Sequence, residues 1–138
     1  MTTILKNEYR IPSHIAEAGA TAMVVTPAPL AGTWVNVNSS TKDLVKVVIT
    51  ASGSGMTVNP YGACVPNPCN WGSVAGTAYA ANVSSSRAVA FSADFDFGFS
   101  RVTVVGHLHG SELLVETFTV FTDGSGRSNL YTTDTLKK

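Results

Sequence analysis

From Gly32 onward, short segments rich in Val, Thr, Phe and Tyr alternate with clusters of Gly, Ser and Asn. Segments of this composition between turn-forming residues are typical of β-strands. The pattern predicts strands over residues 32–38, 43–51, 55–62, 71–81, 87–98, 101–109, 112–122 and 127–136. Short connections favour antiparallel pairing of sequence neighbours, and closure of the sheet removes its exposed edges. We therefore expect an all-β fold, a single antiparallel up-and-down β-barrel of about eight strands.

Residues 1–31 have a different pattern. Ser13 is an N-cap residue followed by helix formers as far as Ala18, which predicts one short helical turn. The prolines of Thr26-Pro27-Ala28-Pro29 then end any regular structure. We divide the chain into an irregular N-terminal arm, residues 1–31, that packs along or across the barrel, and a barrel domain, residues 32–138.

One hairpin predicts its own register. Gly110-Ser111 has glycine first, which suits a two-residue type II′ turn. This turn pairs His109 with Glu112 and His107 with Leu114. It also places Glu116 opposite Val105.

A second two-residue turn, at Phe99-Ser100, would pair Phe97 with Val102 and Phe91 with Leu108. Together the two turns separate the side chains into two faces. The apolar face, the expected core, carries Phe91, Phe95, Phe97, Val102, Val104, Leu108, Leu113, Val115 and Phe121. The other face carries Asp94, Asp96, Arg101, Thr103, His107, His109, Glu112 and Glu116. A slip of one residue would mix them, so the separation supports the register.

Charge limits the classes of partner. Only 13% of the 138 residues are charged and the formal net charge is zero. Without a basic stripe, nucleic acid is not an expected partner. No apolar stretch approaches the ~20 residues of a membrane helix, so we expect no membrane partner. Residues 1–9 lack the order of a signal peptide, which leaves a cytoplasmic protein or a mature secreted form as alternatives.

Gly32-Thr33-Trp34, at the start of the first predicted barrel strand, resembles the Gly-x-Trp opening of the calycin barrels, which include lipocalins and avidins. Residues 31–36, Ala-Gly-Thr-Trp-Val-Asn, look most like an avidin-type first strand. The resemblance implies that Trp34 closes one barrel end beneath a basic residue, for which Arg127, Lys137 or Lys138 is available. The ring of Trp, Ser and Asp residues expected of a biotin binder cannot be placed, so biotin binding is not carried over.

Aromatic side chains with polar tips suit a small-molecule or glycan site. The candidate ligand contacts are Trp34, Asn36, Tyr61, Trp71, Tyr79, Glu116 and Tyr131. The alternative for the aromatic residues is ordinary core and end packing.

Glu116 has apolar neighbours on its own face, which could raise its pKa and suit it to general acid–base work. With His107 it defines a cofactor-free enzyme of cyclase or isomerase type as an alternative function. That alternative requires both side chains to point into an enclosed cavity.

His107 and His109 share a strand face, and Glu112 lies beside them. Two imidazoles and a carboxylate suit zinc or a similar metal. Ordinary cross-strand pairs on a solvated face are the alternative, and we expect no cofactor.

Cys64 and Cys69 flank two prolines that impose an extended or turn conformation. Either a small disulfide or two free thiols is consistent with this loop.

The leading hypothesis is a non-enzymatic barrel that binds a small molecule or a glycan in its mouth or interior. An enzyme is the alternative. A third possibility is an interaction module that works as a homo-oligomer, because low charge suits a wide subunit interface.

Overall fold

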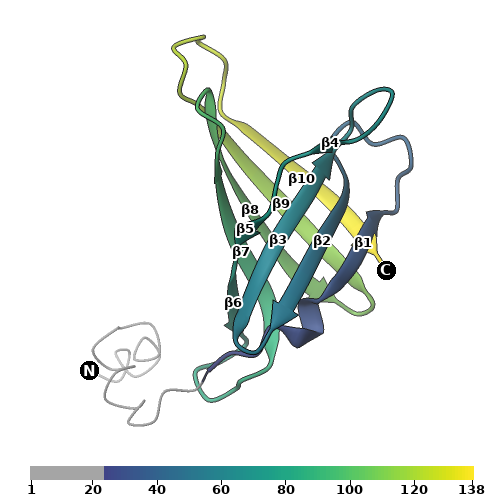
Figure 1. Cartoon of the computed structure of the whole chain (residues 1–138), viewed down its shortest axis with the longest axis vertical. Coiled ribbons are helices and arrows are strands. Elements are labelled where there is room, and N and C mark those ends of the chain that lie inside the picture. Colours follow the sequence, from purple (N-terminus) through teal and green to yellow (C-terminus); the bar gives the residue numbers. More distant parts are fainter. Residues whose placement is uncertain (1–23) are drawn as a thin grey trace, which may run out of the picture.

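A computed structural model describes residues 24–138 as an antiparallel all-β protein (Figure 1). One sheet contains ten strands: β1 (Gly32–Asn36), β2 (Leu44–Ser52), β3 (Gly55–Gly62), β4 (Cys69–Asn70), β5 (Val74–Ala75), β6 (Thr77–Ala80), β7 (Ala88–Asp96), β8 (Ser100–His109), β9 (Glu112–Phe121) and β10 (Leu130–Lys137). Their order is β4-β3-β2-β1-β10-β9-β8-β7-β6, and β5 pairs with β3 beside this path. The all-β antiparallel class is therefore confirmed.

The part of the N-terminal arm within the described residues contains a single turn of 3₁₀ helix, η2 (Ala28–Leu30), and a parallel bridge between Thr26 and Arg87. The helical turn predicted near residues 13–18 lies outside the described residues. Over residues 24–138, no helix has the length and apolar character needed to cross a membrane.

Alternation along the strands produces one apolar core inside the curved sheet. In β1, for example, Trp34 and Asn36 are buried whereas Thr33 and Val35 are exposed. Burial of each large apolar side chain contributes about 1.5–3 kcal/mol, which makes this face the main source of stability. The core cluster consists of Leu30, Trp34, Leu44, Val47, Ile49, Met56, Val58, Ala88, Phe91, Ala93, Phe95, Val102, Val104, Leu113, Val115 and Leu136.

The ends of the sheet meet at a seam between β3 and β7 that hydrogen bonds do not close. β5 pairs with β3, the Gly76 amide donates to the Met56 carbonyl at 3.1 Å, and the chain then continues as β6 on β7. This crossing divides the single strand predicted over residues 71–81. Gly72 has a φ of +88°, which favours glycine, and a Cβ on Gly76 would lie 2.9 Å from Val58 Cγ2. The sheet thus has ten strands and is not closed by hydrogen bonds among the described residues, so the predicted closed barrel of about eight strands is not confirmed.

The register predicted for β8 and β9 is confirmed, including the pairs His109–Glu112 and His107–Leu114. A type II′ turn requires a positive φ at its first central residue and a negative φ at its second. Gly110 has a φ of +62°, and among the described residues only glycines have a positive φ, so Ser111 does not. The glycine conformation fixes the turn and hence every pair along the hairpin.

The register predicted for β7 and β8 is wrong by two residues. Phe95 pairs with Val102, and Phe91 pairs with Gly106 rather than with Leu108. The chain reverses around Gly98, whose φ is +85°, and not at Phe99-Ser100. Because side chains alternate with a period of two, this shift leaves each side chain on its predicted face.

The two ends of the curved sheet differ. The upper end in Figure 1 carries the β1–β2, β3–β4, β7–β8 and β9–β10 connections, and the lower end carries η2 and the β2–β3, β6–β7 and β8–β9 connections. Trp34 lies toward the lower end, where its Nε1 donates to the Leu30 carbonyl at 2.8 Å. Lys138 Nζ lies 4.9 Å from its ring centroid. Of the three basic residues considered for this position, Lys138 covers Trp34, whereas Arg127 belongs to the upper end.

Candidate functional site

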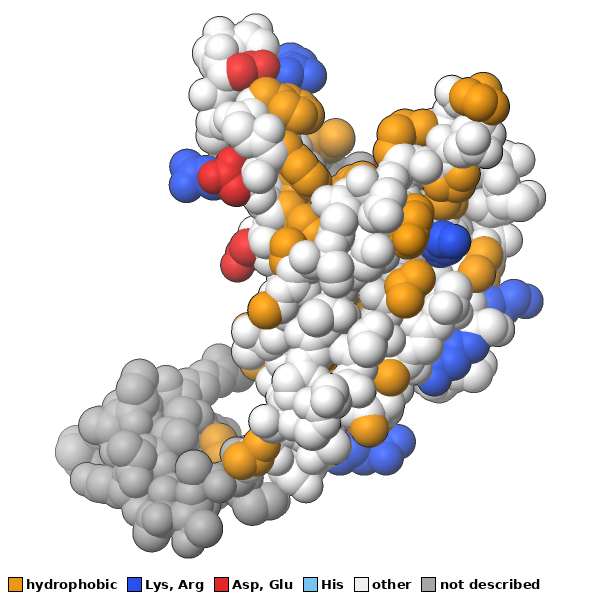
Figure 2. All heavy atoms as spheres, in the orientation of Figure 1, with side chains coloured by type: hydrophobic (Ala, Val, Ile, Leu, Met, Phe, Trp, Pro, Cys, Tyr) orange, Lys and Arg blue, Asp and Glu red, His pale blue; other side chains and the backbone are white. Residues whose placement is uncertain are grey.

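The upper end contains a cavity of about 460 Å³, which we call the aromatic cavity. Figure 2 shows apolar side chains along the hollow between the two upper tips. The volume is within the usual range of small-molecule sites, roughly 300–1,000 Å³. Its lining combines four aromatic rings with one aliphatic and three neutral polar side chains: Asn70, Trp71, Phe97, Phe99, Ser100, Val102, Thr119 and Phe121.

Trp71 forms one wall of the aromatic cavity at the seam. It directly follows β4, and its amide donates to the Pro60 carbonyl of β3 at 3.0 Å. Its ring packs edge-on against Phe95 and Phe97 of the opposite sheet end, with centroid distances of 5.7 and 5.4 Å. A Cβ on Gly62 would lie 3.0 Å from the indole Nε1, so the ring lies close against the β3 backbone. Trp71 therefore bridges β3 and β7 with its side chain.

The opposite wall comes from the β7–β8 turn and the β9–β10 loop. Phe97 and Phe99 stack with their centroids 6.4 Å apart. The Thr122 amide donates to the Phe99 carbonyl at 2.9 Å, and the Thr122 hydroxyl donates to the Gly98 carbonyl at 2.8 Å. These bonds join the two connections, so the phenylalanine side chains present a fixed apolar surface.

Arg127 holds the β9–β10 loop over this wall. Its guanidinium carbon lies 4.0 Å from the Phe121 ring centroid, and its Nη2 lies 2.8 Å from Asp123 Oδ2. Hydrogen bonds from Ser125, followed by the contact with Arg127, lower the pKa of Asp123 to about 2. Arg127 is thus already paired with a carboxylate, and no residue that lines the aromatic cavity is charged. The lining of the aromatic cavity is therefore electrically neutral.

Polar side chains on the inner face of β1, β9 and β10 lie below the cavity. Asn36 Nδ2 donates to the Leu44 carbonyl at 2.8 Å and to Asp134 Oδ1 at 2.9 Å. Thr117 Oγ1 and Asp134 Oδ2 are buried and have no hydrogen-bond partner among the described residues. Burial raises the pKa of Asp134, although hydrogen bonds from Asn36 and Thr41 partly oppose this effect. Asn36, predicted to contact a ligand, is bonded within the protein.

Of the predicted ligand contacts, only Trp71 lines the aromatic cavity. The three tyrosines lie elsewhere. Tyr61 lies beneath Lys46, whose Nζ is 4.4 Å from the ring centroid, and the Tyr79 hydroxyl is 2.8 Å from Ser92 Oγ. Tyr79 and Tyr131 are about half exposed.

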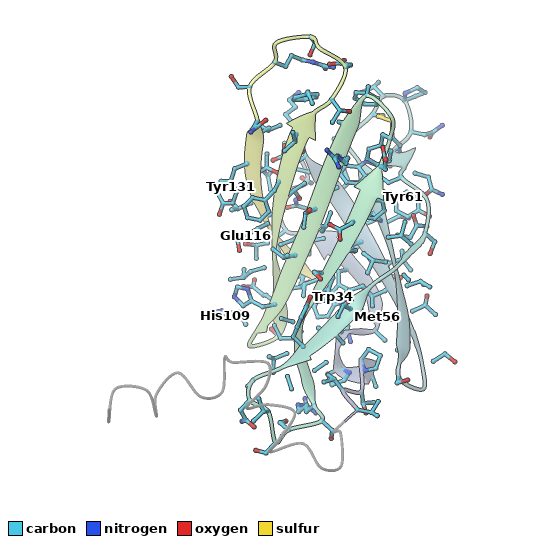
Figure 3. The ribbon with its side chains drawn as sticks, turned by 90° about the vertical axis from the view of Figure 1, so that its left-hand side faces the viewer. Trp34, Met56, Tyr61, His109, Glu116 and Tyr131 are labelled. Atoms are coloured by element: carbon cyan, nitrogen blue, oxygen red, sulfur yellow. A yellow bond between two sulfur atoms is a disulfide. The ribbon has the colours of Figure 1, made fainter. Side chains whose placement is uncertain are left out.

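Glu116 and Tyr131 lie on the outer face of the sheet (Figure 3). The Tyr131 hydroxyl donates to Glu116 Oε2 at 2.5 Å, and this bond raises the pKa of the tyrosine. His107 is exposed on the same face of the neighbouring strand β8. The acid–base pair proposed for an enzyme is therefore not placed in an enclosed cavity, the condition on which that alternative depends.

His109 and Glu112 are paired across β8 and β9, and Lys137 of β10 lies on the other side of Glu112. Over residues 24–138, no three or more His, Cys, Asp or Glu side chains gather closely enough to hold a metal ion. The predicted set of His107, His109 and Glu112 is thus not assembled as a metal site.

A second cavity, of about 430 Å³, lies at the lower end beside Trp34. Its lining includes Arg87, Lys137 and Lys138, together with the Gly110-Ser111 turn. Unlike the aromatic cavity, its lining carries three basic side chains, and Trp34 belongs both to this lining and to the core cluster.

Cys64 and Cys69 form a disulfide with a Cα–Cα distance of 5.4 Å. Both residues are exposed, and Cys69 pairs with Gly62 in the β3–β4 hairpin. Of the two alternatives left open by the sequence, the structure contains the disulfide, and Cys69 lies two residues before Trp71.

Exposed apolar side chains also occur away from the cavity. Phe118, Val120 and Tyr131 on the outer side of β9 and β10 are 44%, 43% and 54% exposed. An apolar outer surface is consistent with a subunit interface, and the homo-oligomer stays a prediction.

The sequence predicts that Phe97 and Phe121 belong to the core and that Phe99 belongs to a turn, and it assigns no role to Asn70 or Thr119. The available signal was the position of the phenylalanines. Phe97 and Phe99 flank Gly98 at the point where β7 ends, and Phe121 ends β9. Inward-facing aromatic residues at strand ends pack against neighbours on one side only, and there a cavity can open.

The comparisons with known proteins give no further assignment: no protein-family model, no curated protein and no solved structure matches this chain.

Proposed function

We propose that this protein is a non-enzymatic binding protein that takes a small, neutral, mainly apolar ligand with a planar ring into the aromatic cavity. In this proposal the curved sheet works as a calycin-like barrel, with its lower end closed by Trp34 and its upper end open to the ligand. The observation that carries the proposal is a cavity of about 460 Å³ between Trp71 and three phenylalanines.

The chemistry of the lining supports this class of ligand over a glycan. Aromatic rings in offset or edge-to-face contact contribute about 0.5–1.5 kcal/mol each beyond simple burial. Asn70, Ser100 and Thr119 supply a few neutral hydrogen-bonding groups, enough to orient a ligand but few for the many hydroxyls of a sugar. Without a charged group in the lining, a charged ligand would lose its hydration without compensation.

The proposal is tested by fluorescence titration with N-phenylnaphthylamine, a neutral planar dye that brightens in apolar sites. We expect saturable binding, and Phe99→Ala should weaken it about tenfold, because one lost ring contact is worth ~1.4 kcal/mol. Tyr131→Ala is the matched control, since this ring is equally exposed but lies on the outer face.

A thermal-shift screen of neutral aromatic compounds and oligosaccharides distinguishes the ligand classes, because a ligand that binds only the native state must raise its stability. Absence of dye binding, or equal loss in Phe99→Ala and Tyr131→Ala, would contradict the proposed site. Stabilisation by oligosaccharides alone would replace the apolar ligand with a glycan.

A further inference from the structure

We propose that the Cys64–Cys69 disulfide positions Trp71, so that the aromatic cavity binds its ligand in the oxidised protein and loosens when the disulfide is reduced. This inference rests on the proposed function, because it concerns control of the same cavity. It assigns the disulfide a role at the site, beyond stabilising the loop.

The position of the disulfide connects it to the cavity wall. It closes the turn between β3 and β4, and β4 pairs with β3 through only two residue pairs, Gly62–Cys69 and Tyr61–Asn70. Trp71 follows immediately. A strand of two residues has little pairing of its own, so the covalent bond adds an important restraint to the Trp71 amide bond that holds this segment on β3.

Few other bonds hold the segment from residue 63 to residue 71. Its backbone bonds beyond β4 are those of the Ala63 amide to the Asp43 carbonyl, 2.8 Å, and of the Trp71 amide to the Pro60 carbonyl, 3.0 Å, among the described residues. Pro66 and Pro68 have no amide hydrogen to donate. With the disulfide open, the chain between these two anchors gains conformational freedom. Trp71 then keeps its amide bond to Pro60 and its ring contacts with Phe95 and Phe97, and we infer that its ring takes up a wider range of positions without the covalent restraint two residues before it.

The opposite wall does not depend on sulfur. Phe97, Phe99 and Phe121 are held by the Thr122 hydrogen bonds and by Arg127, which pairs with Asp123. Reduction should therefore change one wall and leave the other in place. Because only the Trp71 wall should respond to reduction, a change in the aromatic cavity can be distinguished from unfolding of the whole protein.

A dithiol can reach the bond, because Cys64 and Cys69 are both exposed. One thiolate of the dithiol attacks a cysteine sulfur, the Cys64–Cys69 bond breaks, and a mixed disulfide forms. The second thiol of the reagent then displaces the protein sulfur. The two cysteines end as thiols after taking up two electrons and two protons, and the dithiol is oxidised to its own disulfide.

The test uses the whole protein labelled with fluorotryptophan, whose two tryptophans, Trp34 and Trp71, give two fluorine resonances assigned by Trp71→Phe. Dithiothreitol is the reductant, and alkylation followed by mass measurement verifies that both thiols are free. We expect the Trp71 resonance to shift and sharpen while that of Trp34 stays. The dissociation constant for N-phenylnaphthylamine should rise at least fivefold and return on reoxidation.

The double variant Cys64→Ser/Cys69→Ser should match the reduced protein and ignore dithiothreitol. The inference is overturned if both thiols are alkylated while the Trp71 resonance and the dye affinity stay unchanged. It is equally overturned if the Trp34 resonance changes together with that of Trp71, since the bond would then stabilise the whole fold. Absence of dye binding to the oxidised protein refutes the proposed function, whereas the response of Trp71 still decides whether the disulfide positions this side chain.

Discussion

The lower and upper halves of the curved sheet are built from the same strands but end differently. In the lower half, inward-facing side chains are buried, and Trp34 is only 3% exposed beneath η2 and Lys138. In the upper half, inward-facing aromatic residues line an open cavity. Alternation along the strands is the same in both halves, so it does not by itself determine whether inner side chains fill the space between them.

The seam explains the difference. In the lower half, β5 and β6 carry the chain across from β3 to β7, and this crossing brings the two sheet ends together. The pairing of β6 with β7 reaches only to Ser92, whereas β7 continues to Asp96. Beyond Ser92 the side chain of Trp71 spans the gap instead of a backbone ladder. A side-chain bridge leaves space that a packed strand would occupy.

The largest expected effect separates the two tryptophans. Trp34→Ala should reduce the free energy of unfolding by about 3–5 kcal/mol, as large-to-small changes at buried aromatic residues do. Trp71→Ala should cost less than ~2 kcal/mol, because one side of this ring faces the cavity and loses fewer contacts. Urea unfolding measures both values.

Substitutions at the same two positions should give the opposite order for binding. Trp71→Ala should abolish tight binding of N-phenylnaphthylamine, whereas Trp34→Phe, which retains a large ring at the lower end, should bind the dye like the wild type. Equal stability losses for both alanine variants would mean that the upper half is packed as tightly as the lower.

A smaller effect tests how closely the core between the ends is packed. A Cβ on Gly106 would clash with Phe91 Cε1, so glycine at this position makes room for the ring. Gly106→Ala should reduce the free energy of unfolding by about 1–3 kcal/mol through overpacking. Differential scanning calorimetry and urea unfolding would report the loss.

The control is a double variant. Phe91→Leu removes the clashing part of the ring, so Gly106→Ala should cost less in a Phe91→Leu background than in the wild type. Additive losses would show that the two positions do not compete for the same space.

The sequence predicts the register of two strands where the residues of the connecting turn specify that register by themselves. Gly110-Ser111 specifies its own turn, so the β8–β9 register follows from two residues. At the other end of β8, both Gly98 and Phe99-Ser100 offer turn residues. A turn at Phe99-Ser100 predicts a β7–β8 register that differs from the observed one by two positions. Each side chain still lies on its predicted face of the sheet, because a shift of two residues preserves the alternation of side chains.

The candidate site was less predictable because it depends on contacts across the seam. Trp71 packs on Phe97, which is distant in sequence, and no local pattern specifies that meeting. Tyrosine hydroxyls suggested ligand contacts, but a tyrosine also suits an outer face, where its hydroxyl reaches a partner such as Glu116. Phe97 and Phe121 looked like core residues because they occupy inward positions, and only the tertiary structure shows that the core ends there.

The smallest effect concerns the polar interior below the aromatic cavity, where the upper half departs most from an apolar core. Burial raises the pKa of Asp134 in the folded protein above the ordinary value of an aspartate, which it keeps in the unfolded chain. Its favourable contribution is therefore fully present below that value and is lost as the pH rises through the raised pKa. Asp134→Asn is neutral at every pH and should be more stable than the wild type at pH ~7, by less than ~1 kcal/mol because the carboxyl is only partly shielded from solvent. The gain should disappear at pH ~3 in urea unfolding.

Thr117→Val is the control for Asp134→Asn. It replaces a buried hydroxyl that has no partner among the described residues, so any gain in stability should be the same at both pH values. A gain for Asp134→Asn that does not depend on pH would show that hydrogen bonding, and not the buried charge, makes this half of the interior less stable than the apolar half below it.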